Sequence, residues 1–94
     1  MTDDVLIKLV DMPDEMQTFA IDSSRDIMNE LESQRNDSDY DQLVAKALKM
    51  KFDEHYGGKW QCIVGTAFGS WISHQSGHFF YFSIGDYAIL LFKI

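Results

Sequence analysis

The chain lacks most of what would build a crosslinked, basic or membrane-embedded protein. Cys62 is the single cysteine among 94 residues, so no disulfide can form within the chain and a reducing compartment is expected. No apolar run approaches the roughly 20 residues of a membrane span. Acidic residues outnumber basic ones by 15 to 8, for a formal net charge of −7. Because Lys and Arg are needed to neutralise phosphates, nucleic acid and anionic membranes are disfavoured as partners. The first residues carry acids where a secretory signal carries positive charge, so a cytosolic protein is expected.

What the chain has in quantity is apolar and aromatic surface. Hydrophobic residues make up 46% of it and aromatic residues 14%, a composition that excludes a disordered chain. The length fits one domain over residues 1–94. From Trp60 onward the chain holds both tryptophans and five of the seven phenylalanines. So short a chain cannot readily cover that much aromatic surface, which favours a second copy covering part of it.

The N-terminal third predicts a strand followed by a helix. Residues 5–10, VLIKLV, are apolar and β-branched and are bounded by acids, as a short strand would be. Pro13 suits a first helical turn, and Asp11 is the expected N-cap. Apolar residues then recur at helical spacing as far as Leu31, so a helix is expected over this stretch.

A polar, turn-prone segment leads into a second helix and then into short strands. The helix is expected to be capped by Asp39 or Asp41 and to end at Gly57-Gly58. Four strands are predicted after it, at Trp60 to Gly65, Phe68 to His74, His78 to Ile84 and Tyr87 to Lys93. The order β-α-α-β-β-β-β predicts an α+β domain with two helices packed on an antiparallel sheet.

An alternating acidic run in the middle of the chain begins like a calcium loop. Asp37, Asp39 and Asp41 have the right spacing, but Gln42 and Leu48 stand where that loop needs glycine and glutamate. A solvated, helix-capping loop is therefore expected instead of a calcium site.

Neither the histidines nor the cysteine make a convincing site. His74 and His78 are four apart, but the strand-and-turn pattern around them is not helical and no third metal ligand is near in sequence. Cys62 alternates in phase with Trp60 and Val64, which is typical of a small buried hydrophobe. No metal site, cofactor or catalytic group is therefore expected, and the chain is predicted not to be an enzyme.

The stretch from Phe68 to His74 mixes glycine, two serines and a histidine with large apolar residues. A fully buried central strand would be more uniformly apolar. The mixture favours a strand with one flank open to a partner's backbone, where main-chain hydrogen bonds give affinity and alternate side chains give specificity. Exposed strand edges are common and usually protected, so composition alone leaves this open.

The C-terminal third resembles a known family. WQCIVGTAFGSWISHQSGHFFYFSIGDYAILLFK, residues 60–93, is similar to the second half of the small peptide-binding cytoplasmic dynein light chains. Their pattern reads W-H-C-I-V-G-x-x-F-G-S-Y-V-T-H-E-x-x-H-F-F-Y-F and ends in A-I-L-L-F-K. Lys8, Asp11-Met12 and Lys51-Phe52-Asp53 match in the first half. The resemblance covers nearly the whole chain and is looser between Thr18 and Leu43.

The resemblance implies a non-catalytic, strand-exchanged homodimer that acts as a dimerisation hub. Residues 68–74 would cross to the other protomer's sheet and form two identical grooves with the second helix. The ligands would be extended, disordered segments, often with a Thr-Gln-Thr-like core, in the dynein intermediate chain and other proteins. The implied location is the cytoplasm, in association with the microtubule cytoskeleton and a dynein motor. The alternative is a dedicated structural paralogue, tegumental or axonemal, with one specific partner.

The implied peptide site takes its residues from three parts of the chain. The exchanged strand would supply the residues that pair with the peptide, Gly69, Ser70, Trp71, Ile72, Ser73 and His74. The floor of the pocket would be formed by Phe68, Phe79 and Tyr81. Asp41 and Gln42 would receive the ligand glutamine, whose side chain mimics a helix cap, and Lys8 would lie near one end of the peptide. The implied dimer interface contains Gln61, Phe68, Ser70 and Ile72.

Several positions depart from the family pattern. Gln61 replaces a histidine whose protonation separates the subunits in acid, so that switch is expected to be absent. Gln42, Ser83 and Leu9 replace a lysine, a tyrosine and an asparagine. These changes bear on ligand preference more than on fold and indicate a divergent paralogue.

Overall fold

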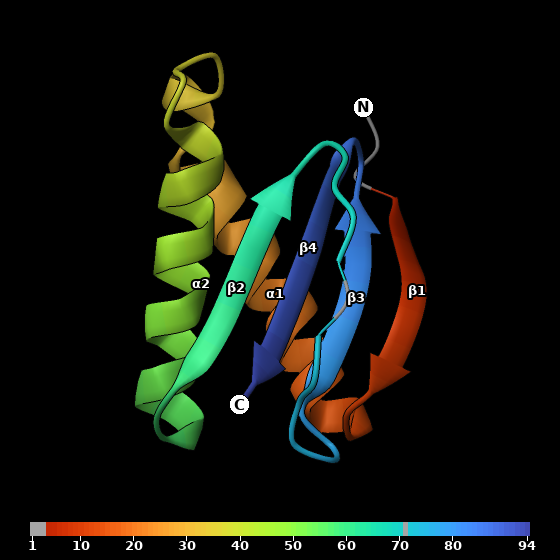
Figure 1. Ribbon diagram of the computed structural model, residues 1–94. Helices are drawn as coiled ribbons and strands as arrows, with labels where there is room; N and C mark the ends of the chain where they lie inside the picture. The colour runs from red at the N-terminus through yellow and green to blue at the C-terminus, as the bar shows by residue number, and fades with distance from the viewer. Residues whose placement is uncertain (1–3, 71) are drawn as a thin grey trace.

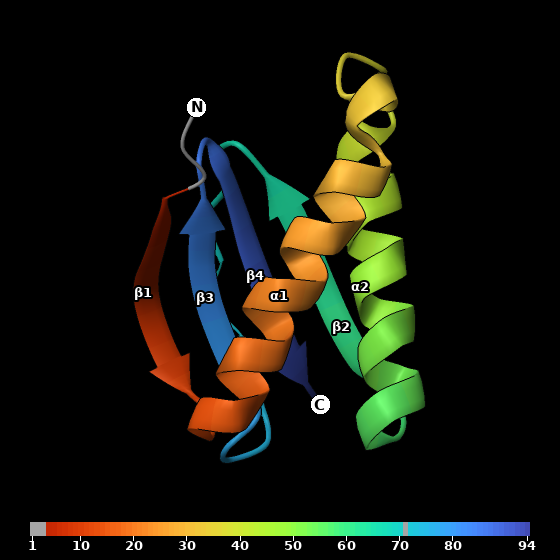
Figure 2. The same ribbon diagram turned by 180° about the vertical axis from the view of Figure 1, so that it is seen from behind.

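The computed structural model describes residues 4–70 and 72–94. Its elements are β1 (Val5–Asp11), α1 (Asp14–Glu30), the 3-10 turn η1 (Glu32–Gln34), α2 (Tyr40–Tyr56), β2 (Trp60–Gly65), β3 (Phe79–Ile84) and β4 (Tyr87–Lys93). The four strands form one antiparallel sheet in the order β1-β3-β4-β2, and both helices lie on the same side of it (Figures 1 and 2). The predicted α+β fold, with two helices on an antiparallel sheet, is confirmed. None of the helices in the described residues has the length and hydrophobicity that a membrane crossing requires.

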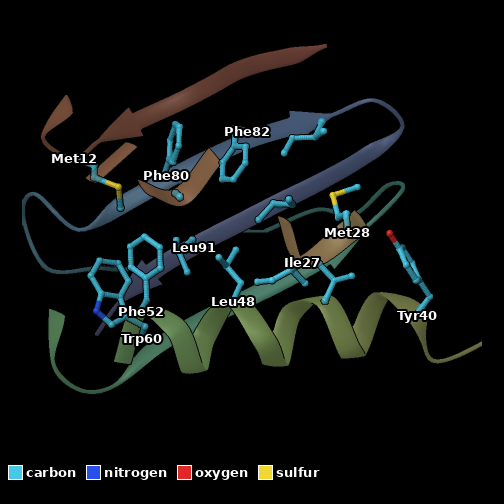
Figure 3. Packing of buried hydrophobic residues seen from close by; sticks show 14 residues of the cluster. Met12, Ile27, Met28, Tyr40, Leu48, Phe52, Trp60, Phe80, Phe82 and Leu91 are labelled. Atoms are coloured by element: carbon cyan, nitrogen blue, oxygen red, sulfur yellow. The ribbon is translucent and has the colours of Figure 1, made fainter. Parts of the chain in front are cut away.

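The main core lies between the helices and one face of the sheet. The stripe of α2 residues spaced four apart, Val44, Leu48 and Phe52, is completely buried, and it faces side chains such as Phe80 and Leu91 from the central strands (Figure 3). Two-residue periodicity in the strands and near-four-residue periodicity in the helix bring these side chains together. Each such burial stabilises the fold by about 1.5–3 kcal/mol.

The predicted N-cap of the first helix, Asp11, is wrong, whereas Asp39, one of the two residues predicted to cap the second helix, is its N-cap. The N-cap of α1 is Pro13, and it makes no side-chain cap hydrogen bond. Asp11 still belongs to β1, and its carboxylate accepts a hydrogen bond from the Gly77 N–H at 3.0 Å instead. Asp39 is the N-cap of α2, as one alternative had it, but its side chain makes no cap hydrogen bond either, and Asp41 lies in the first turn.

The strand expected between Phe68 and His74 does not form within the described part of one chain. Residues 68–70 and 72–74 belong to no helix or strand, and Trp71 lies outside the described residues. The neighbouring strands formed nearly where they were predicted, with β3 starting at Phe79 instead of His78. Because β3 and β4 are central and paired on both sides, only the outer edges of β1 and β2 remain for a further strand.

One carboxylate holds the turn between α2 and β2. Asp53 accepts hydrogen bonds from the backbone N–H groups of Lys59 at 3.1 Å and Trp60 at 2.8 Å, and Lys49 Nζ donates to its other oxygen at 2.7 Å. Lys59 has a φ of +87°, a conformation that costs a residue with a side chain, so these bonds stabilise a strained turn. Burial acts to raise the pKa of Asp53, but the hydrogen bonds from Lys49 and Trp60 outweigh it and lower the pKa overall.

Replacing Asp53 with alanine is expected to lower the free energy of unfolding by about 2 kcal/mol at neutral pH, because two backbone donors and an ammonium lose a charged acceptor. The pKa of this carboxyl is lower in the folded than in the unfolded protein. Its contribution is therefore complete above the unfolded value near 4 and disappears as the pH falls through the folded value. Urea unfolding at pH 7 and in acid measures the difference in free energy of unfolding between the unmodified protein and Asp53→Ala. That difference should be smaller in acid. Glu54→Ala, an exposed neighbour on α2, serves as the control, and an equal deficit for both variants would contradict the prediction.

Candidate functional site

The face of the sheet opposite the helices is built from three rows of side chains, because paired residues of neighbouring strands share a face. The strand registers give, from β1 through β3 and β4 to β2, the rows Asp11, Phe79, Phe92, Gln61; then Leu9, Tyr81, Leu90, Ile63; then Leu6, Ser83, Ala88, Gly65. We call this surface the open face. Most of it is apolar, although no helix covers it (Figure 1).

The segment between β2 and β3 runs across this open face, on the side opposite α1 (Figures 1 and 2). Phe68 and Ile72 pack against a buried cluster formed by Phe79, Leu90 and Phe92. The Phe68 and Tyr81 rings lie 5.8 Å apart. The segment therefore covers with its own apolar side chains a surface that the helices leave bare.

The downstream end of the segment is attached to the sheet by backbone hydrogen bonds. The Gln75 N–H donates to the Lys93 carbonyl at 2.9 Å, and the Lys93 N–H donates to the His78 carbonyl at 3.0 Å. The rings of His74 and Phe79 lie against each other at a tilt of 34°, with 4.6 Å between their centroids. Upstream of Gln75 the described part of the segment makes no such hydrogen bonds. Residues 68–70 and 72–74 form no backbone–backbone hydrogen bond with any other described residue. Their main-chain donors and acceptors are available to another chain.

A cavity of about 320 Å³ lies between this segment, β1 and β3. Its lining consists of Leu9, Ser70, Ile72, His74, Phe79 and Tyr81. The ammonium of Lys8 lies beside it, 5.3 Å from the centroid of the Tyr81 ring. The site thus combines an apolar floor, two polar side chains and unpaired backbone, which suits an extended peptide with alternating side chains better than a small polar substrate.

The structure brings together most of the residues predicted for a peptide site, but not all of them. Those that lie along the cavity and the segment are Lys8, Phe68, Gly69, Ser70, Ile72, Ser73, His74, Phe79 and Tyr81. Asp41 and Gln42 lie at the start of α2, in the helix layer on the other side of the sheet, so one chain does not assemble the complete set. Trp71 is outside the described residues. Gln61 is on the open face of β2, paired with Phe92.

Leu6 and Leu9 both belong to this surface; the family pattern marked Leu9 as a position that bears on ligand preference, but nothing in the sequence placed Leu6 beside it. They are three apart, which in a regular strand places them on opposite faces. The register shifts between Ile7 and Leu9, so that Leu6 pairs with Ser83 and Leu9 with Tyr81 on the same face. Such a bulge adds one residue to a strand. No feature of VLIKLV marks it, and only the pairing with β3 reveals it.

Metal and thiol chemistry find no support at the described residues. No group of three or more His, Cys, Asp or Glu side chains among them could hold a metal ion. Cys62 packs against the main core, and burial raises the pKa of its thiol to about 12. It is therefore a protonated thiol at neutral pH, in keeping with its interpretation as a small buried hydrophobe.

The fold and the site together define a small α+β protein with two helices on one face of a four-stranded sheet and a detached segment on the other. The chain belongs to the dynein light chain family, because residues 4–94 match the family described as "Dynein light chain type 1". It is also 38% identical over 87 residues to the cytoplasmic dynein light chain of Emericella nidulans. The aligned residues cover 93% of this chain and 85% of that protein.

Solved structures with little sequence identity share the fold. The dynein light chain-like domain of the calcium binding protein FhCaBP2 from Fasciola hepatica matches with a TM-score of 0.82 at 19% identity, covering 100% of this chain and 95% of that one. A second structure of that domain gives 0.78 at 22% identity, with 98% and 92% covered. The dynein light chain-like domain of CsTAL3 gives 0.73 at 21% identity, with 95% and 90% covered.

Proposed function

We propose that this protein is a non-catalytic homodimeric hub that binds short extended peptides by strand addition at the boundary between two subunits. It would serve as a light chain of a dynein motor, in the cytoplasm and in association with microtubules. The observation that carries the proposal is the backbone of residues 68–70 and 72–74, which has no main-chain partner among the described residues. Family membership and the name of the Emericella nidulans relative support the motor association.

Exchange of the segment between two subunits would satisfy its backbone. β2 is an edge strand of the sheet, and an extended partner segment can pair along its outer side. Ile63 on the open face of β2 is 40% exposed in one chain, so a subunit packed there would remove apolar surface from water. Gln61, Phe68, Ser70 and Ile72 would lie at this interface. The other edge of each exchanged segment would remain free to pair with a ligand.

The partner subunit would complete each groove with the start of its second helix. Because the Asp39 side chain makes no cap hydrogen bond, the first backbone N–H groups of α2 have no side-chain acceptor from this residue. A ligand glutamine could provide that acceptor, with Asp41 and Gln42 on either side of it. This arrangement accounts for why Asp41 and Gln42 lie apart from residues 68–74 within one chain.

Two identical grooves on a dimer would favour dimeric clients. Each groove holds one segment with modest affinity, but binding of the first segment raises the effective concentration of the second. Intermediate chains of dynein and other proteins with extended disordered motifs are the proposed clients. The protein would then strengthen the pairing of whatever two chains it holds.

Sedimentation equilibrium at micromolar concentration, together with titration of a fluorescent Thr-Gln-Thr peptide, tests the proposal. The expected result is a dimer mass and one bound peptide per chain. The dimer mass should persist from pH 7 to pH 5, because Gln61 carries no titratable group at the interface. A monomer mass at micromolar concentration would contradict the strand exchange. A dimer that binds no peptide even at high peptide concentration would contradict the groove.

A further inference from the structure

β1 is the edge strand opposite β2, and no element of the described chain lies beyond it (Figure 1). Apart from the ladder with β3, residues 5–11 form no backbone–backbone hydrogen bond with any described residue. An edge strand directs alternate N–H and C=O groups outward, where a further strand can bond to them. In the proposed dimer the exchanged segment would occupy the outer side of β2, so β1 would be the edge that stays free.

Large aliphatic side chains lie on both faces of β1 and remain exposed. Leu6 and Leu9, on the open face, are 60% and 61% exposed. Ile7 and Val10 pair with core residues of β3 and so lie on the helix side of the sheet, yet they are 46% and 39% exposed. Figure 2 shows the reason, because α1 starts beside the C-terminal end of β1 and runs away from it across the sheet. Four exposed aliphatic residues on one strand with a free edge are typical of a surface that a partner covers.

Acidic side chains lie at both ends of this aliphatic strand. At one end Asp11 belongs to the open face, and its side chain is 51% exposed. At the other end Asp4 is exposed and lies close to Asp86, since the N–H of the neighbouring Gly85 donates to the Asp4 carbonyl at 3.0 Å. Lys8 is the one basic residue in the strand, and its ammonium lies 5.3 Å from the centre of an aromatic ring of β3, away from either end. The strand therefore presents aliphatic side chains between two negatively charged ends.

We infer that the outer edge of β1 binds, by strand addition, an extended segment of another protein that carries aliphatic residues between two basic ones. The bulge between Ile7 and Leu9 removes one step of the alternation along the strand. On the open face β1 consequently presents, in order, Asp4, Leu6, Leu9 and Asp11. A partner strand would match them with a basic residue, two aliphatic residues and a second basic residue at its positions one, three, five and seven. Main-chain hydrogen bonds would supply affinity, and the two acidic ends would select for basic residues.

A second copy of β1 suits this edge poorly because its charges conflict with those already there. In an antiparallel pair with twofold symmetry, the register centred on Lys8 places the two Lys8 side chains opposite each other. The neighbouring register places Asp4 opposite Asp11 at both ends. Like charges directly opposite each other destabilise a sheet, whereas a segment with basic ends would make both end contacts favourable. The net charge of −7 adds a long-range attraction for such a segment.

The fluorescent peptide Lys-Val-Leu-Thr-Leu-Val-Lys, titrated by anisotropy, tests the inference. Its sequence reads the same in both directions, so either strand direction presents the same side chains. At low salt it should bind about tenfold more tightly than the same peptide with glutamate at both ends, and salt should reduce that advantage. Asp4→Lys should also reduce it, because one end of the strand then carries the opposite charge. Hydrogen exchange of the residue 4–11 amides should slow when the lysine-ended peptide is bound.

A pair of serine variants tests the aliphatic surface separately from the charges. Ile7→Ser should weaken binding of the lysine-ended peptide about fivefold, because less apolar surface leaves water when the strand is added. Met50→Ser is the matched control, since Met50 is 58% exposed on α2, beside the other edge of the sheet, and should leave the affinity unchanged. Equal losses in both variants would overturn the inference.

The remaining outcomes separate the inference from the proposed function. Equal affinity for the lysine-ended and glutamate-ended peptides, or binding of neither, overturns the inference and leaves the hub proposal standing. Displacement of the lysine-ended peptide by a Thr-Gln-Thr peptide would place it in the groove of residues 68–74, which also overturns the inference. An assembly larger than a dimer that Ile7→Ser disperses would make a second copy the occupant of the edge and overturn it too. Binding of the lysine-ended peptide without binding of the Thr-Gln-Thr peptide supports the inference and contradicts the proposed function alone.

Discussion

Replacing Gly69 with valine is expected to weaken binding of a Thr-Gln-Thr peptide by at least about tenfold while the protein stays folded, because a strand glycine marks a close approach of another chain. A Cβ at Gly69 meets no atom of the described residues within 4 Å, so the substitution meets no steric conflict with that part of the chain. In the proposed groove, however, a β-branched side chain would project from the pairing segment into the space between the two subunits. The measurement is fluorescence anisotropy, with circular dichroism to confirm the fold.

Gly58→Val is the matched control for this variant. Gly58 follows α2, is exposed, and likewise has no atom of the described chain within 4 Å of an added Cβ. Its backbone is not in the positive-φ region, so valine is tolerated there as at Gly69. Equal peptide affinity of Gly69→Val and the unmodified protein would show that the groove is assigned to the wrong segment. A loss shared by both valine variants would point to a general effect of the substitution.

Replacing Ile63 with glutamate is expected to convert the dimer to a monomer. Ile63 lies on the open face of edge strand β2 and is partly exposed in one chain, so a single subunit tolerates the charge. At a subunit interface the charge would be buried without a partner, at a cost of about 3–5 kcal/mol. That cost raises the dissociation constant by about two to four orders of magnitude, and the twofold symmetry of a homodimer applies it twice.

Sedimentation velocity over a concentration series measures this effect, with Met50→Glu as the control. Met50 is a large apolar residue on α2, 58% exposed, so it receives the same new charge away from the open face. Loss of the dimer in Ile63→Glu alone would support an interface over β2. If Ile63→Glu remains dimeric at micromolar concentration, the open face of β2 does not lie between subunits and the exchange proposal needs another interface.

The helices and the paired strands follow from local patterns. Val44, Leu48 and Phe52 are spaced so that only a helix buries them together, and all three are completely buried. In β3 the alternation of Phe80 and Phe82 with Tyr81 places the first two in the main core and the third on the open face. Such periodicities depend on neighbours within a few residues, which is why the sequence was sufficient for them.

The helix starts show where local reasoning reached its limit. Asp11 has the side chain and nearly the position of an N-cap, but its backbone pairs with Phe79 in the sheet and its carboxylate bonds to Gly77, which is 66 residues away. A capping tendency of about 1 kcal/mol is small enough for tertiary pairing to override. The bulge between Ile7 and Leu9 has the same origin, since it depends on how β1 aligns with β3.

The sequence by itself determined the order of elements, the apolar face of α2, the inward side of each central strand and the unusual polar content of residues 68–74. Only the tertiary structure decided that residues 68–70 and 72–74 lie on the open face without a main-chain partner among the described residues, that Leu6 and Leu9 share that face, and that Asp41 and Gln42 stand apart from it. The reason is physical. Periodicity is a property of the chain's own backbone geometry, whereas strand partners and exposed surfaces depend on which edges and faces remain unoccupied once distant segments have packed.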